Sequence, residues 1–388
     1  MIFSAPLGPG RVARQHVCQA GETLQWAMYR RTFYYAVKGL DRLGAPSRSL
    51  LAKGMSAVGS GVAEFTLALT GGGDESSDKA PDADHLIFGP AGDSLAVRTM
   101  SRFKPGRQER LLWALTSERL VIAVRVQAAA PEPEPEPKSF LGKAIEFGKD
   151  IGKILADNRM KFGDNVEGEP IDVPQYRVVV EIPRAQIAEA RPDRVVLVDG
   201  SGFEFLLEPP AVSEKDAGIV RKELTKHWLR RGENLVLGLA PVIGYVGAVV
   251  AGSLHVPWTA TGPMPPLELG KLRWPLPAPP SPQDWLDDPT LGYWVEAPAT
   301  SSLAMQFADH FAFSRGNARL AVSDQRVAVV YPTHLFEAKP SNVFTTFAEI
   351  PRTAVRSLET VFTGCTLPAH PVVRLTFADG SRLHLRQP

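Results

Sequence analysis

The sequence predicts an α+β protein organised around a β-rich unit that occurs twice. The first landmark of this unit is a hairpin, in which two apolar runs flank a polar tetrad that ends in arginine. The second is the tetrapeptide Glu-Ile-Pro-Arg, and the third is a strand pair around Asp-Gly-Ser. The three landmarks begin at Leu111, Glu181 and Asp199 in the first copy and at Arg319, Glu349 and Asp379 in the second. Their common order indicates an internal duplication.

These residues resemble the bacterial PH-like domains of the PH/GRAM superfamily, which carry Leu-Thr-x-x-Arg-Leu, then Ile-Pro-x-x-x-Ile, then two strands around Asp-Gly. The first copy matches at Leu115, Thr116, Arg119, Leu120, Ile182, Pro183, Ile187, Asp199 and Gly200. The second copy departs at Val322, Ser323, Val327 and Val355. The resemblance implies two small PH-like β-barrels, with accessory N-terminal and inserted helices around them. It also implies a fold that carries binding functions more often than catalysis.

Composition sets limits on function. A chain of 388 residues with 44% hydrophobic and 22% charged residues is typical of a globular protein of two or three domains. The net charge of +1 gives no general attraction to nucleic acid, so nucleic acid is not an expected partner. Two cysteines, Cys18 and Cys365, fit a reducing compartment, and no export signal is predicted.

No pattern in the sequence indicates catalysis. A phosphate-binding glycine loop, zinc-spaced cysteines and histidines, and a nucleophile elbow are all missing from the sequence. We therefore expect a non-enzyme without catalytic residues, metal or cofactor.

Four regions are expected along the chain. They are an N-terminal helical region at 1–80, a first PH-like domain at 81–232, an apolar segment and Pro/Trp-rich connector at 233–300, and a second PH-like domain at 301–388. In the first region, aromatic and aliphatic residues at spacings of three and four predict a helix over Glu22–Leu40, and a weaker pattern predicts another over Ser49–Thr70. The first helix is expected to face a core, an anionic membrane or nucleic acid.

A basic loop is expected between the opening strands of the first domain, which we place at Leu86–Phe88 and Ser94–Met100. The loop spans Ser101–Arg110 and contains only one acid, Glu109. In PH-like domains such a loop often binds headgroups, so the resemblance implies a phosphate or acidic-peptide site; the alternative is a solvated basic loop. The candidate ligand residues are Arg102, Lys104, Arg107 and Arg110.

The first copy contains an insertion, at about 131–170, that the second lacks. It opens with alternating proline and glutamate, which predicts an extended spacer, and continues with an amphipathic helix over Ser139–Phe162. The apolar face of this helix is expected to pack on its own domain, on a protein partner or on a membrane. Its candidate partner-binding residues are Phe140, Phe147, Ile151, Ile154 and Leu155.

A helix is predicted at Ser213–Arg231 and is expected to close the first barrel. The second copy ends directly after its last strand. We therefore expect its exposed core to be covered by a helix from residues 22–70, from the 213–231 region or from a partner.

An uncharged stretch of about twenty residues at Leu235–Leu254 is close to the length that spans a bilayer. Membrane insertion, as a span or a re-entrant hairpin, and burial within the protein or an oligomer are the alternatives. The candidate membrane residues are Leu235, Val242, Tyr245, Val249 and Leu254.

The function expected from these features is a non-enzymatic adaptor or scaffold that binds a protein partner, or a further copy of itself, at or near the cytoplasmic membrane face. The first alternative is an anionic-lipid-binding protein, either peripheral or inserted in the membrane. The second is an enzyme on a PH-like frame. Localisation is expected to be cytoplasmic, with association to or insertion in the cytoplasmic membrane as an open alternative.

Overall fold

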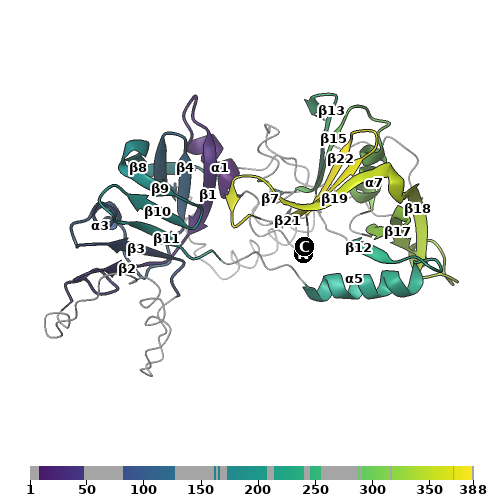
Figure 1. Cartoon of the computed structure of the whole chain (residues 1–388), viewed down its shortest axis with the longest axis horizontal. Coiled ribbons are helices and arrows are strands. Elements are labelled where there is room, and N and C mark those ends of the chain that lie inside the picture. The colour runs from purple at the N-terminus through teal and green to yellow at the C-terminus, as the bar shows by residue number, and fades with distance from the viewer. Residues whose placement is uncertain are drawn as a thin grey trace, which may run out of the picture.

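The computed structural model describes residues 8–47, 82–126, 161–162, 165–166, 173–207, 214–239, 245–254, 287, 291–314, 317–369 and 371–386. The expected α+β class is confirmed, with strands predominating over helices. The four larger sheets fall into two pairs, and each pair contains one copy of the repeat (Figure 1). Two short strands, β6 (Lys161–Phe162) and β7 (Asn165–Val166), form a separate ladder.

The first copy begins with a helix and has a second short helix before its hairpin. Its elements are α1 (Pro9–His16), β1 (Leu24–Arg30), β2 (Phe33–Val37), β3 (His85–Gly89), α3 (Leu95–Met100), β4 (Leu111–Thr116), β5 (Arg119–Arg125), β8 (Tyr176–Pro183), η1 (Arg184–Gln186), β9 (Ile187–Ala190), β10 (Arg194–Leu197) and β11 (Gly202–Phe205).

The second copy repeats this order and has three additional short elements. Its elements are α5 (Glu214–His227), β12 (Leu235–Leu239), β13 (Tyr245–Val250), β14 (Ser253–Leu254), β15 (Leu291–Ala297), α7 (Leu303–Phe313), β16 (Arg319–Ser323), β17 (Arg326–Pro332), η2 (Thr333–Leu335), β18 (Phe344–Pro351), η3 (Arg352–Ala354), β19 (Val355–Phe362), β20 (Thr366–Leu367), β21 (Pro371–Phe377) and β22 (Arg382–Arg386).

Strand pairing is the same in both copies. The first sheet has the order β1-β4-β5-β8 in one copy and β12-β16-β17-β18 in the other, and the second has β2-β3-β11-β10-β9 and β13-β15-β22-β21-β19. The pairs β2–β3 and β13–β15 are both parallel, whereas the neighbouring pairs are antiparallel. The duplication is therefore confirmed, and it includes strands at residues 24–37 and 235–297 that lie outside the three sequence landmarks.

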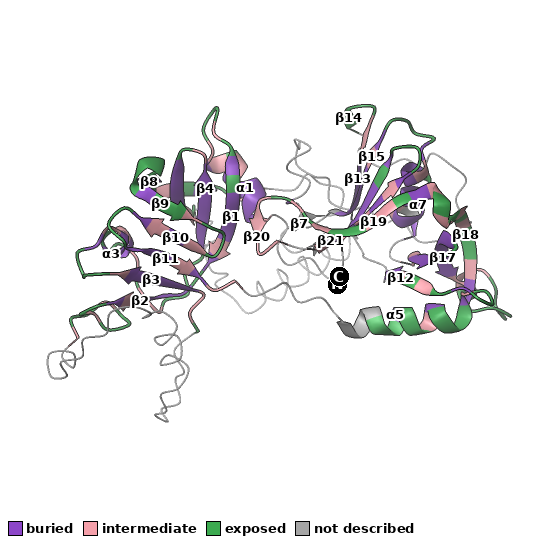
Figure 2. Cartoon of the chain, viewed as in Figure 1, coloured by how far each residue is buried: buried purple, intermediate pink, exposed green. Residues whose placement is uncertain are grey.

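The main core of each copy lies between its two sheets. Because successive side chains of a strand point to opposite faces of the sheet, alternate residues pack either in this inner core or in a second apolar layer on the outer face of the sheet. In β4, Leu111, Trp113 and Leu115 face the inner core, while Leu112 and Ala114 face outward. All six residues of β4 are buried because a helix covers the outer face as well (Figure 2). The second copy shows the same division between its inner core and the layer under α5.

The covering helices are α1 and α5. Val12, Ala13 and Val17 pack on the outer face of the first copy. In α5, Val220 and Leu224 pack with the adjoining Trp228 on the second copy. The expectation that the helix at 213–231 closes the first copy is therefore wrong. The region does supply a cover for the second copy, as one of the three alternatives anticipated.

The repeated Asp-Gly-Ser turn fixes the start of an inner helix. The Leu95 and Ala96 N–H groups donate to Asp199 Oδ2 at 2.7 Å and to Ser201 Oγ at 3.0 Å. Burial of Asp199 opposes its ionisation, but these hydrogen bonds outweigh that effect and lower its pKa. In the second copy, Asp379 and Ser381 bind the start of α7 in the same way, at 2.7 and 3.1 Å.

Two elements predicted in the first hundred residues are wrong. Residues 22–40 contain strands β1 and β2 rather than one helix, so this part of the N-terminal region is not helical. Residues 94–100, expected as a strand, contain helix α3. The loop at 101–110 therefore connects α3 to β4. The helix predicted over 49–70 lies outside the described residues.

The uncharged stretch at 235–254 is also not one helix. Its described parts contain strands β12, β13 and β14. Strand β12 pairs with β16, and β13 pairs with both β15 and β14. Of the candidate membrane residues, Leu235 and Val249 are half-buried in sheets and Leu254 is exposed. Tyr245 begins β13, and Val242 lies outside the described residues. Within the described ranges, no helix has the length and apolar character that a membrane crossing requires.

A short junction connects the copies. Between β19 and β21, the second copy extends β20 to the first, where Thr366 and Leu367 pair in parallel with Ala27 and Met28 of β1 (Figure 2). Asp287, whose side chain is completely buried, accepts the Cys365 and Thr366 N–H groups at 2.9 and 2.8 Å and forms an ion pair with Arg14 of α1. The junction is therefore held by both backbone pairing and a buried ionic contact.

We expect Gly202→Ala to destabilise the first copy. A Cβ at this position would lie 2.0 Å from the carbonyl oxygen of Val195 on the paired strand and 2.6 Å from the Phe88 ring. Overpacking of this kind costs about 1–3 kcal/mol. Urea unfolding measures the change, with Gly218→Ala as control, because no atom lies within 4 Å of a Cβ there. Equal midpoints for the two variants would contradict the prediction.

Stability should fall with pH below neutrality, in part because of His384. Burial lowers the pKa of this histidine to about 3, aided by Arg374 and Arg382, and its ring stacks on Trp294 at 4.5 Å. Glu296 lies 3.6 Å from Nε2, too far for a hydrogen bond that would offset burial. Between pH 6.5 and 3 the unfolded chain binds a proton that the folded chain does not, so stability decreases as pH falls.

The variant His384→Phe keeps a stacking ring and removes this titration. Its loss of stability between pH 7.5 and 5 should be smaller than that of the wild type by about 2 kcal/mol. Denaturant unfolding at the two pH values measures the difference. Parallel pH profiles for the two proteins would show that His384 does not titrate in this way.

Candidate binding site

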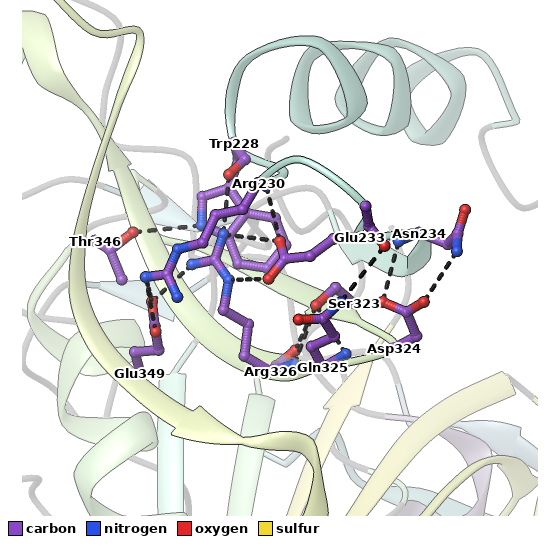
Figure 3. A network of polar contacts seen from close by, with 11 residues as sticks. Trp228, Arg230, Glu233, Asn234, Ser323, Asp324, Gln325, Arg326, Thr346 and Glu349 are labelled. Atoms are coloured by element: carbon purple, nitrogen blue, oxygen red, sulfur yellow. Dashed lines mark hydrogen bonds and ion pairs between the residues drawn. The ribbon is translucent and has the colours of Figure 1, made fainter.

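The hairpin arginine of each copy lies at the centre of a polar network. Its side chain and that of one glutamate are buried, whereas the second glutamate of the network is more exposed. In the second copy, Arg326 Nε and Nη2 donate to the two carboxylate oxygens of Glu233 at 2.7 and 3.1 Å (Figure 3). Its Nη1 donates to Glu349 at 2.6 Å, and Nη2 also donates to the Trp228 carbonyl at 3.0 Å. The indole ring of Trp228 stacks against the guanidinium, with its centroid 4.0 Å from Cζ.

The first copy has the same arrangement around Arg119. Its Nε and Nη2 donate to Glu22 at 2.8 and 3.2 Å, Nη1 pairs with Glu181 at 2.8 Å, and Nη2 donates to the Val17 carbonyl at 3.0 Å. The repeated arginine and the glutamate of Glu-Ile-Pro-Arg are thus partners in both copies. The arginine also connects the hairpin to the segment between the covering helix and the first strand, through Glu22 and Val17 in the first copy. In the second copy it does so through Glu233 and Trp228.

The ion pairs stabilise the ionised forms of both the arginine and the glutamate. Hydrogen bonding to Arg119 lowers the pKa of Glu22, and hydrogen bonding to Glu22 raises the pKa of Arg119. Hydrogen bonding to Arg326 lowers the pKa of Glu233 in the same way. Burial opposes the charge on Arg326, but its bonds to Glu233 and Glu349 outweigh this and raise its pKa.

The two buried glutamates, Glu22 and Glu233, were not among the predicted residues, although the sequence contains a signal for them. Gly-Glu-Thr-Leu at 21–24 and Gly-Glu-Asn-Leu at 232–235 form a fourth repeated landmark before each first strand. The glycine has a positive φ in both copies, +87° and +88°, and turns the chain from the helix into the strand. In each copy the backbone N–H three residues before the glutamate binds its carboxylate, from Gln19 to Glu22 and from Arg230 to Glu233.

This alignment shows three differences at equivalent positions. Gln19 of the first copy corresponds to Arg230 of the second, Val17 corresponds to Trp228, and Glu118 corresponds to Gln325. In the second copy, Arg230 Nη2 donates to both oxygens of Glu349 at 3.0 and 3.1 Å (Figure 3). Glu349 thus contacts two guanidinium groups. Within the described part of the chain, Glu181 contacts one, that of Arg119.

The first copy has a cavity of about 390 Å³ at this place, and the cavity is wide open to solvent. It is lined by Gln19, Ala20, Gly21, Glu22, Glu118, Arg119 and Glu181. Three glutamates and one arginine give the lining a formal charge of −2. In the second copy, the equivalent Glu233 and Glu349 are balanced by Arg326 and Arg230.

The predicted basic loop lies elsewhere in the first copy. All four candidate cations are exposed, and Arg102 Nη1 donates to the Val179 carbonyl at 2.6 Å, while Arg110 lies over the Tyr29 ring at 5.4 Å. The Glu109 N–H donates to the Arg31 carbonyl at 3.2 Å, which brings the β1–β2 turn beside the loop. The structure therefore adds Arg31 to the basic surface.

The candidate partner-binding residues of the inserted helix are not described. The five apolar residues of the inserted helix, Phe140, Phe147, Ile151, Ile154 and Leu155, lie outside the described ranges. Among the described residues, no group of three or more histidine, cysteine or acidic side chains is arranged to hold a metal ion. Comparisons with protein-family models, with curated proteins and with solved structures gave no match for this chain.

Proposed function

We propose that the protein is a non-enzymatic adaptor, built of tandem PH-like domains, which binds a protein partner at or near the cytoplasmic face of a membrane. The observation that carries this proposal is the acidic cavity of the first copy. The two copies share one fold and one network around the hairpin arginine, yet only the first has an uncompensated −2 charge at this place among the described residues. A duplicated fold whose copies differ at one surface position suits a protein with a single partner site.

The junction supports an adaptor role. Strand β20 and the buried Asp287 connect the second copy to β1 and α1. These two elements flank residues 19–22, which line the cavity of the first copy. A partner bound at the cavity is therefore held close to the contact between the copies. This arrangement suits a scaffold that presents two domains in a fixed relation.

Cross-linking followed by mass spectrometry tests the proposal with the full-length chain. The variant Glu118→Lys reverses a charge of the cavity, and Glu109→Lys reverses an exposed charge on the basic loop. We expect one partner to be recovered with the wild type and with Glu109→Lys, and to be reduced at least fivefold with Glu118→Lys. Equal recovery with both variants would contradict a partner site at the cavity.

Binding of anionic lipid is the second candidate, and the exposed basic surface favours it. Arg102, Lys104, Arg107 and Arg110 lie beside Arg31 in the first copy. Flotation with phosphatidylserine vesicles tests it: the triple replacement of Arg102, Lys104 and Arg107 by alanine should abolish binding, and binding should weaken with salt. Vesicle binding that neither the replacement nor salt changes would exclude the loop.

A further inference from the structure

We propose that the cavity of the first copy receives the guanidinium group of an arginine side chain from the protein partner. This inference rests on the proposed function, because it names the chemical group that the partner presents. It comes from a comparison of equivalent positions in the two copies, in which the second copy contains the contact that the first one lacks.

The second copy supplies this guanidinium from its own chain. Arg230 Nη2 donates to both carboxylate oxygens of Glu349, and Arg326 Nη1 donates to the same carboxylate (Figure 3). The equivalent Glu181 has the equivalent bond from Arg119. At the position of Arg230, however, the first copy has Gln19, which is shorter and uncharged.

The cavity has space and charge for the missing group. Its volume of about 390 Å³ exceeds that of a guanidinium with its methylene stem, and Glu118 adds a carboxylate where the second copy has a neutral glutamine. A planar guanidinium donates through several N–H groups in fixed directions, which suits a site where more than one carboxylate accepts. Arginine is therefore favoured over lysine.

The charge of the lining also favours an arginine within a peptide over free arginine. The α-carboxylate of the free amino acid would need a cation, and the one cation of the lining, Arg119, is already bonded to Glu22 and Glu181. A peptide unit carries no such charge. The occupant is thus expected to be a side chain that projects from a protein partner.

Fluorescence anisotropy with labelled peptides tests the inference directly on the full-length protein. The probes are a Gly-Arg-Gly peptide with blocked termini and its Gly-citrulline-Gly and Gly-Lys-Gly counterparts, with free arginine as competitor. We expect the arginine peptide to bind at least tenfold more tightly than the citrulline peptide, with lysine between them. Free arginine should compete weakly. Equal affinity for arginine and citrulline, or competition by free arginine as strong as by the unlabelled peptide, would overturn the inference.

Variants locate the binding in the cavity. Gln19→Arg recreates Arg230 of the second copy and should reduce affinity at least tenfold, because the protein then fills the place itself. Gln15→Arg adds the same charge at an exposed position of α1 outside the lining and should leave affinity within twofold. Glu118→Gln copies Gln325 and should weaken binding three- to tenfold. Unchanged binding by Gln19→Arg would overturn the inference.

The two proposals fail in different ways. A protein that binds no arginine peptide but still loses its partner in Glu118→Lys retains a partner site at the cavity and disproves the guanidinium ligand. A protein that binds the arginine peptide with the expected variant effects, but recovers no partner by cross-linking, disproves the adaptor role and not the chemistry of the cavity.

Discussion

Replacement of Arg326 by methionine is expected to lower the free energy of unfolding of the second copy by about 3–5 kcal/mol. The side chains of Arg326 and Glu233 are only 6% and 2% exposed, so the variant leaves a buried carboxylate without its partner. The Trp228 carbonyl also loses its guanidinium donor. Urea unfolding followed by tryptophan fluorescence measures the change.

The double variant Arg326→Met with Glu233→Met separates the cost of an unpaired charge from the value of the pair itself. Replacing both members of a buried ion pair by apolar residues is often neutral, so the double variant should recover most of the lost stability. A single variant within 1 kcal/mol of the wild type would show that the network does not stabilise the fold. A double variant as unstable as the single one would show that Arg326 acts through its other contacts.

Replacement of Asp287 by alanine is expected to release β20 from β1, with a loss of about 3–5 kcal/mol of stability at the junction. The change removes the acceptor of the Cys365 and Thr366 N–H groups and leaves Arg14 without this carboxylate. The Ala27 N–H, which donates to the Cys365 carbonyl at 2.7 Å, should then exchange with solvent much faster. Hydrogen exchange with mass spectrometry measures this amide.

The control for this prediction is Asp287→Asn, which keeps one acceptor oxygen but removes the charge opposite Arg14. Its effect on Ala27 exchange should lie between those of the wild type and the alanine variant. Protection of Ala27 that is unchanged in Asp287→Ala would show that strand pairing alone holds the two copies together.

The duplication could be predicted from the sequence because its landmarks carry interactions within each copy. The hairpin arginine and the glutamate of Glu-Ile-Pro-Arg bind each other, and the Asp-Gly-Ser turn binds the start of α3 or α7. These contacts require the same residue types in both copies. They therefore remain visible although most neighbouring positions differ.

The sequence of the N-terminal strands predicts a helix because burial on both faces hides the alternation of a strand. In β1 only Gln25 is exposed, since α1 covers one face and the inner core the other. Two such strands separated by Arg31 and Thr32 place aromatic residues at spacings of three and four. The many aromatic residues in this stretch favour strands, and they indicate the structure better than the spacing does.

Helix α3 could not be predicted locally because the groups that hold its start come from far along the chain. Asp199 and Ser201 lie about a hundred positions from Leu95 and Ala96. The uncharged stretch at 235–254 similarly owes its apolar character to packing within sheets. The candidate cavity cannot be recognised from the three sequence landmarks. It depends on which residues of the two copies are equivalent, and this equivalence rests on the fourth landmark, at Glu22 and Glu233.

A crystal structure of the full-length protein with the blocked Gly-Arg-Gly peptide tests the central claim most directly. We predict that the peptide guanidinium binds Glu181 in the first copy at the place that Arg230 occupies beside Glu349 in the second. A peptide bound elsewhere, or a cavity that stays empty at saturating peptide, would contradict the assignment of this cavity as an arginine site.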